Sequence, residues 1–374
     1  MSWKKTKKQR SLLPLRYNQI MDLLAIWSKA WPILLAIFFF GIIIFVHELG
    51  HFLFAKLFKV KVNEFSMGMG PKLFGFGKKE TKYSVRLFPI GGYVSMEGED
   101  EDSEDDRAFG KKKVWQRFII VAAGAVMNLI LGFIVATILM SMQNLIGTTT
   151  IAGFDKDSVL KDTFKPGDRI VEINDKRAYS HYDLSFLMSR DDDGVFDFVI
   201  EREGEKKELK NVKFRTTENE EAPQKISIVF DFIIYGEKPG VLNSVKYGFL
   251  TTLSLGRMVW LSLFDLVTGQ YGLSDLSGPI GTMDFIASAA QEAKADLSPV
   301  LMIMALITVN IGLFNLLPIP ALDGGRLFFM LIEIIIRRPI NPKYERWIHA
   351  AGMILLLLFM AVISFNDIWK LIKG

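Results

Sequence analysis

The sequence contains no cysteine, and only four of its 374 residues are histidines. The absence of cysteine excludes disulfide bonds and thiolate metal sites, but it does not identify a cellular compartment. The formal net charge of +4 is too small to indicate a nucleic-acid partner, and basic residues beside membrane spans explain it better. A metal site with three histidines would need His181 or His349, so a carboxylate is the expected third ligand.

Hydrophobic residues make up 50% of the chain, and the mean hydropathy of +0.26 is high for a soluble protein of this size. These residues are clustered rather than spread, which indicates membrane spans and makes the lipid bilayer a partner. We expect four transmembrane helices, which lie at about 31–55, at about 114–140, within 297–322 and at about 347–365.

The motif His47-Glu48-Leu49-Gly50-His51 lies in the last third of the first expected span. His47 and His51 are four residues apart, so a helix presents both on one face. Two neutral imidazoles in this position can bind Zn²⁺, and the carboxylate of Glu48 can act on water at the metal. Ionisable groups inside a span are costly and are therefore functional candidates. Taken alone, the pattern could also be a chance match or two histidines at a membrane surface.

Asp323 is the candidate for a third metal ligand. Pro318 and Pro320 break the end of the third expected span just before it. Irregular backbone near membrane depth is tolerated only where protein or water covers it, so Asp323 is expected to face inward. With four spans, the ends of the first and third spans lie on the same side, which brings Asp323 level with His47 and His51. Two histidines and one carboxylate with an open fourth position form a catalytic zinc arrangement.

Composition divides the chain into five parts. We expect a basic tail and interfacial segment at 1–30, a membrane core at 31–149 and 297–374, a small β-rich domain at 150–217, and a linker with a membrane-associated amphipathic helix at 218–296. Within the core, 72–96 alternates around a Pro-Ile-Gly-Gly break and predicts a β-hairpin. Small residues at 122–125 would allow close helix packing, and Asn128 would either link helices or face the active site.

Basic residues suggest which side of the membrane each loop occupies. Lys and Arg concentrate in 56–113 and 326–346, so the positive-inside rule places these loops in the cytoplasm and 150–296 outside. The basic N-terminal tail would then lie outside, against the rule, but the larger basic loop outweighs it. The candidate active site is therefore expected toward the cytoplasmic side.

Five motifs in this order resemble those of bacterial site-2 proteases of the RseP type, which perform regulated intramembrane proteolysis. They are His47 to His51, Gly91-Gly92-Tyr93-Val94, the segment 123–128, the segment 276–280 and the segment 315–324. The resemblance covers the chain from about 31 to about 369. It implies an intramembrane zinc endopeptidase in which His47, His51 and Asp323 bind Zn²⁺ and Glu48 is the general acid/base.

The resemblance also implies a fold and a substrate class. The fold is a multi-pass α-helical membrane protein with four transmembrane helices, a membrane-associated β-hairpin and one inserted α+β, β-rich PDZ-like domain. The substrates are single-pass membrane proteins, such as anti-sigma factors or remnant signal peptides, in the bacterial cytoplasmic membrane. The resemblance assigns substrate binding to the hairpin residues and to two asparagines: Gly91, Gly92, Tyr93, Val94, Asn315 and Asn128.

The chain departs from this family in its soluble part. There is room for one PDZ-like domain rather than two, and no glycine-rich carboxylate-binding loop is evident near 151–154. A size gate or a docking surface is therefore expected instead of peptide-terminus capture. Two other functions stay open. One is a catalytically inactive membrane chaperone or scaffold, which would need none of His47, Glu48, His51 and Asp323. The other is a zinc transporter, whose ligands are usually spread along several spans.

Overall fold

The computed structural model describes residues 3–77, 80–99, 101–191, 193–218, 226–269, 278, 281–282, 285–286, 289, 296–338 and 340–373. The chain forms two compact units. The first unit comprises residues 1–125, 272–303 and 316–374, and the second comprises residues 126–271 and 304–315.

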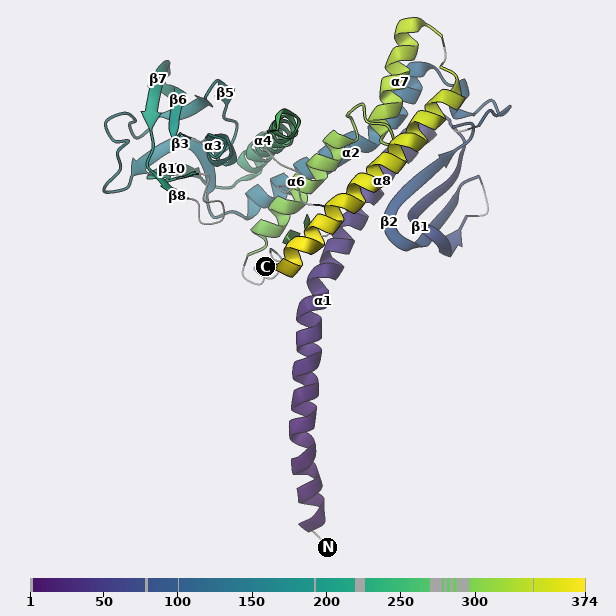
Figure 1. The fold of residues 1–374 in the computed structure, drawn as a ribbon, viewed down its shortest axis with the longest axis horizontal. Helices are drawn as coiled ribbons and strands as arrows, with labels where there is room; N and C mark the ends of the chain where they lie inside the picture. Colours follow the sequence, from purple (N-terminus) through teal and green to yellow (C-terminus); the bar gives the residue numbers. More distant parts are fainter. Residues whose placement is uncertain are drawn as a thin grey trace. The chain divides into compact units, whose positions relative to one another are not determined.

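Within the described residues, four helices are long and apolar enough to cross a membrane. They are Ala30–Leu57 within α1 (Trp3–Leu57), α2 (Val114–Met142), α4 (Val241–Thr268) and Lys343–Lys370 within α8 (Pro342–Lys373). Figure 1 shows α1 as one helix that continues through the boundary expected near residue 30. The number of long apolar helices agrees with the prediction, and these helices together with the β-rich parts are compatible with a membrane protein.

The third of the four long helices differs from the one expected. The segment 297–322 contains α6 (Ser298–Phe314), which has only 17 residues, and then an irregular turn before α7 (Asp323–Ile336). Pro318 lacks an N–H donor and Pro320 restricts the residue before it, so the helix cannot continue through this segment. The other long helix is α4, which lies where a membrane-associated amphipathic helix was expected.

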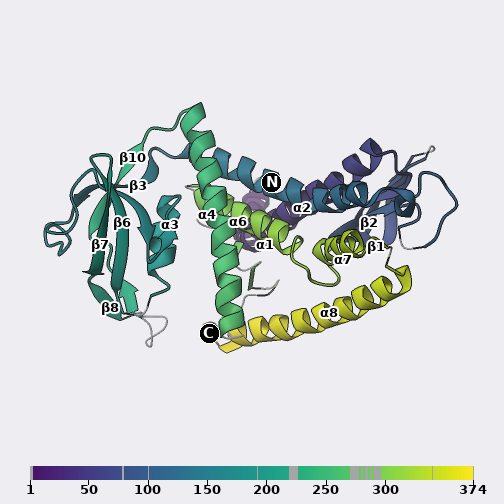
Figure 2. The same ribbon diagram turned by 90° about the horizontal axis from the view of Figure 1, so that it is seen from above.

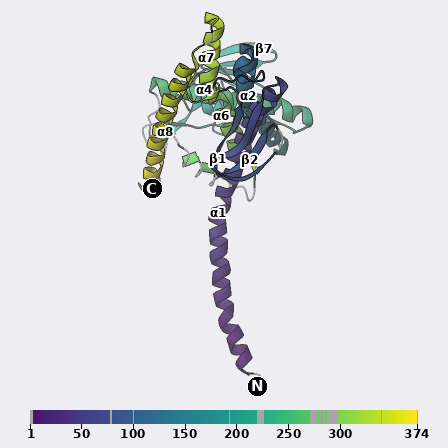
Figure 3. The same ribbon diagram turned by 90° about the vertical axis from the view of Figure 1, so that its right-hand side faces the viewer.

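The hairpin of the first unit consists of β1 (Val62–Phe76) and β2 (Lys82–Met96). The hairpin begins earlier than the expected range of 72–96, because β1 begins at Val62, but the Pro-Ile-Gly-Gly break does separate the two segments of β2, 82–88 and 92–96, that each pair with the first half of β1. Burial along the first half of β1 does not alternate, so that half lacks the period-two signal of a strand. Figure 3 shows the hairpin beside α1.

The two halves of β2 both pair with the first half of β1. Glu64, for example, lies opposite Lys82 in one half and Ser95 in the other. The segment 92–96 pairs with β1, and no pairing on its other edge occurs within the described residues. One apolar cluster then joins the hairpin to α1, α2 and α7, and it includes Ala55, Phe65, Val94, Ile120 and Leu327.

The second unit contains a sheet with the strand order β10-β3-β4-β6-β7, and β5 pairs with β4. Helix α3 (His181–Met188) lies beside this sheet (Figure 2). The sheet extends past residue 217, because β10 pairs antiparallel with β3. The strands are β3 (Ile146–Phe154), β4 (Arg169–Ile173), β5 (Lys176–Arg177), β6 (Val195–Arg202), β7 (Glu205–Lys213), β8 (Thr216–Glu218), β9 (Ile226–Ile228) and β10 (Phe232–Glu237).

Helix α4 is attached to α3 by buried polar contacts. Asp183 is fully buried, and its Oδ2 accepts hydrogen bonds from the Ser180 amide at 2.9 Å and from Ser254 Oγ at 2.7 Å. Arg257 of α4 forms an ion pair with the same carboxylate. The charge of Arg257 within the apolar sequence of α4 is therefore neutralised by Asp183 in the β-rich part of the same unit.

Asp168 makes the best-defined ion pair of the sheet. Nε and Nη2 of Arg202 each donate to one of its oxygens at 2.7 Å, and the Lys165 amide donates at 2.8 Å. Burial alone would raise the pKa of the Asp168 carboxyl, but these hydrogen bonds and the nearby charge of Arg202 hold that pKa below its ordinary value. The pair therefore stabilises the folded state above the ordinary carboxyl range and loses this effect as pH falls through the lowered pKa.

We expect Arg202→Met to lower the free energy of local unfolding by about 3 kcal/mol at pH 7, because it leaves the Asp168 carboxylate buried without its partner. The loss should shrink in acid, where the carboxyl is protonated. Hydrogen-exchange protection of residues 165–173 in the full chain measures it. Arg169→Met is the control, because Arg169 pairs with Glu201 at the surface, where such pairs contribute below about 1 kcal/mol. Equal losses in both variants would contradict the assignment.

Candidate metal centre

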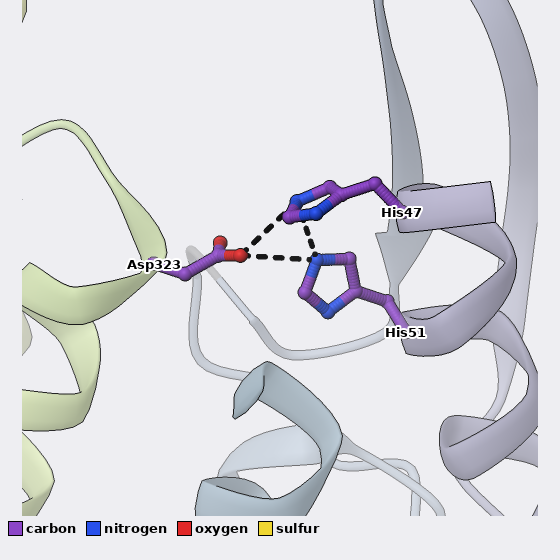
Figure 4. Close-up of side chains that lie close together, drawn as sticks. All are labelled: His47, His51 and Asp323. Atoms are coloured by element: carbon purple, nitrogen blue, oxygen red, sulfur yellow. Dashed lines mark hydrogen bonds and ion pairs between the residues drawn. The ribbon is translucent and has the colours of Figure 1, made fainter. Parts of the chain in front are cut away.

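Three ligand atoms from two helices meet at one point in the first unit. His47 and His51 project from adjacent turns of α1, and Asp323 is the first residue of α7 (Figure 4). Asp323 Oδ2 lies 3.1 Å from His47 Nε2 and 3.3 Å from His51 Nε2, and the two nitrogens are 3.2 Å apart. The structure therefore brings together the three residues predicted as metal ligands.

The spacing and the chemistry of these atoms fit a zinc ion. Zinc binds histidine nitrogen and carboxylate oxygen at about 2.0–2.2 Å, so tetrahedral ligand atoms lie about 3.3–3.6 Å from one another. The three observed separations are close to that value. His51 Nδ1 donates to the Ile120 carbonyl at 2.9 Å, which leaves Nε2 with its lone pair directed at the cluster. Two imidazoles and one carboxylate also leave a fourth tetrahedral position open.

Glycine residues allow α1 and α2 to approach each other at this point. A Cβ at Gly50 would lie 2.7 Å from the Ala123 carbonyl carbon and 2.9 Å from the Gly124 Cα. A Cβ at Gly124 would overlap the His51 ring and lie 2.9 Å from His47 Cε1. The prediction that the small residues at 122–125 permit close packing is therefore confirmed, and Gly124 leaves the space that both imidazoles occupy.

Two ion pairs hold α7, which carries Asp323. Arg117 of α2 contacts Glu333 at 2.7 Å, and both side chains are largely buried. Arg326, one turn after Asp323, pairs with Glu99 just beyond the hairpin. These residues were not predicted from the sequence, although Glu333 is an isolated acid within the apolar segment 327–336 and was a signal for a buried partner.

Glu48 lies between the two histidines and the hairpin. A Cβ at Gly92 would be 2.9 Å from Glu48 Cγ, so only a glycine lets the strand run this close to the carboxylate side chain. Beside it, Gly91 has a φ of +77°, the Tyr93 hydroxyl accepts a hydrogen bond from Arg86 at 2.6 Å, and the Val94 side chain is buried. The backbone at Gly92 is thus placed next to Glu48.

The two predicted asparagines belong to the second unit. Asn128 is fully buried within α2. Asn315 directly follows α6, and its amide donates to the Ile311 carbonyl at 3.1 Å. The cluster of ligand atoms contains neither residue, and their contact with a substrate stays a prediction.

We expect Gly124→Ala to lower the affinity for a divalent metal by about 10–100-fold, the effect usual for residues that orient metal ligands. The added methyl group would displace both imidazoles. Chelator competition with Co²⁺ on the purified protein measures the affinity. Gly41→Ala in α1 is the control, because a Cβ at Gly41 meets no atom within 4 Å. Alanine favours helices over glycine, so lost helix propensity cannot explain a decrease. Unchanged affinity in Gly124→Ala would contradict the site.

Comparisons with known proteins agree with this centre. The family model described as peptidase family M50 matches residues 35–359. A protein of Fusobacterium nucleatum, provisionally named a zinc metalloprotease, is 36% identical over 90% of this chain and 98% of its own length. The regulator of sigma-W protease RasP of Bacillus subtilis is 30% identical over 90% and 97%, and the zinc metalloprotease RasP of Bacillus licheniformis is 31% identical over 90% and 98%. The chain therefore belongs to peptidase family M50, which confirms the prediction of a metalloendopeptidase of the site-2 protease type.

Proposed function

We propose that this protein is an intramembrane zinc endopeptidase that cleaves transmembrane segments of single-pass membrane proteins. The observation that carries the proposal is the meeting of Asp323 with His47 and His51, which lie with Glu48 on a helix apolar enough to span a membrane. Ionisable groups are costly at that depth, and a metal centre with a neighbouring base accounts for all four.

His47, His51 and Asp323 would hold the zinc ion, and each residue has a defined task. A bound zinc ion polarises a peptide carbonyl and increases the acidity of water. Glu48 accepts the proton of the attacking water at its carboxylate and delivers it to the leaving amide nitrogen. Donation from His51 Nδ1 to the Ile120 carbonyl fixes the ring orientation, so that Nε2 stays available.

The strand 92–96 would hold the substrate. Every backbone carbonyl of a membrane helix is already hydrogen-bonded, so cleavage requires local unwinding. An extended substrate could add to the unpaired edge of 92–96 and satisfy its freed amides and carbonyls. This proposal assigns the backbone of Gly91, Gly92, Tyr93 and Val94 to substrate binding. The close contact of Gly92 with Glu48 supports it.

The substrate class and the location are part of the same proposal. The Bacillus subtilis relative is named as a regulator of sigma-W protease, which supports anti-sigma factors as substrates. Remnant signal peptides fit the same chemistry. The bacterial relatives support the cytoplasmic membrane as the location, and the distribution of Lys and Arg supports an active site toward the cytoplasm with the β-rich domain outside. The sheet with α3 at its side supports a PDZ-like domain, which would limit access or dock substrates.

Glu48→Gln should abolish cleavage of a reporter transmembrane segment in proteoliposomes while zinc stays bound, because the amide cannot accept the proton. Peptide fragments identified by mass spectrometry and metal analysis of the same sample measure both properties. Full cleavage by this variant would show that the assignment of Glu48 is wrong. Zinc flux without cleavage by the unaltered protein would favour a transporter, and neither result would favour a scaffold.

Asp323→Ala should lower the zinc content as well as the activity, since it removes one of three protein ligands. Ile335→Ala is a control on the same helix, because the side chain of Ile335 is exposed and lies three turns beyond Asp323. Normal zinc occupancy in Asp323→Ala would contradict the third-ligand assignment.

A further inference from the structure

The turn that presents Asp323 has a backbone conformation that its sequence does not favour. Ala321 has a φ of +78°, in the left-handed region that side chains with a Cβ rarely adopt. Such a residue persists only when its surroundings fix it. The turn contains three internal hydrogen bonds: the Ile319 amide donates to the Leu317 carbonyl at 2.7 Å, the Leu322 amide to the Ile319 carbonyl at 3.2 Å, and the Gly325 amide to the Leu322 carbonyl at 3.1 Å.

Helix α8 supplies a further restraint on this turn. The Ala321 amide donates to His349 Nδ1 at 3.1 Å. His349 also packs on α7, with its ring 5.8 Å from that of Phe329 and its Cε1 3.0 Å from where a Cβ on Gly325 would lie. One turn further along α8, a Cβ on Gly352 would overlap Pro320. Helix α8 therefore packs closely against both Pro320 and Ala321 of the turn.

The hydrogen bond defines the state of the imidazole. A backbone amide can only donate, so His349 Nδ1 must accept and carry no proton. A neutral ring with its proton on Nε2 meets this requirement. The metal centre uses His47 and His51, so His349 is a histidine with a separate task close to that centre.

We propose that His349 is a positioning residue for the metal centre, which acts through Ala321 to hold the turn that places Asp323. This inference rests on the proposed role of Asp323 as a zinc ligand. The imidazole does not touch the metal position. It stabilises a strained backbone two residues before the ligand, and without its acceptor the turn relaxes and the carboxylate leaves the point at which it meets the two histidines.

Two polar substitutions at His349 separate this role from simple packing. The side-chain oxygen of Asn takes the place of Nδ1, whereas the amide of Gln reaches the place of Nε2. We expect His349→Asn to keep Co²⁺ affinity within about threefold, and His349→Gln to lose about 10–100-fold, the usual effect of orienting partners. Chelator competition and the visible d–d spectrum of Co²⁺ in the detergent-solubilised full chain measure this. Equal affinities in the two variants, whether normal or reduced, would overturn the proposal.

A second-site change tests the route through Ala321. Glycine adopts positive φ without strain, so Ala321→Gly should restore most of the Co²⁺ affinity of His349→Gln. No recovery would overturn the claim that His349 acts through this backbone. Asp323→Ala distinguishes the ligand role of Asp323 from the positioning role of His349. If Asp323→Ala keeps full Co²⁺ affinity, the proposed ligand set is wrong. If Asp323→Ala loses affinity and His349→Gln does not, the proposed role of His349 is wrong.

Discussion

The structure depends on the meeting of one carboxylate with two imidazoles among apolar helices. A buried carboxylate is costly unless charge and hydrogen bonds compensate it. Asp323 Oδ2 lies within 3.3 Å of His47 Nε2 and His51 Nε2. A cation at this point would satisfy all three groups together. The requirement links two segments that are far apart in the sequence, so α1 and α7 must be held in one fixed relation.

The surrounding structure maintains that relation by several departures from ordinary helix packing. Gly50 and Gly124 destabilise their helices because glycine loses more conformational entropy on folding than other residues. Their lack of a Cβ lets α2 approach α1 closely enough to confine the imidazoles. Arg117 and Glu333 place a buried ion pair between α2 and α7. The turn before Asp323 contains a strained alanine. Local rules are usually broken at functional sites, and here the exceptions gather around one centre.

The sequence was most informative where chemistry and periodicity coincide. The spacing of His47 and His51 follows from the helical repeat, and the two prolines predicted the irregular backbone before Asp323. The first half of β1 was missed because its burial does not alternate. The end of α6 at Phe314 was also missed, because hydropathy continues to Leu322 while the prolines stop the helix. Contacts such as those of Ile120 and His349 could not be predicted, since they depend on how helices far apart in sequence pack together.

Zinc K-edge X-ray absorption of the purified full chain tests the central claim most directly, because it counts the ligands of the bound metal. We predict a first shell of nitrogen and oxygen at about 2.0–2.2 Å that contains two imidazoles and carboxylate oxygen. The third imidazole of a three-histidine site would have to come from His181 or His349. A spectrum with one or three imidazoles, or with oxygen ligands alone, would contradict a centre built from His47, His51 and Asp323.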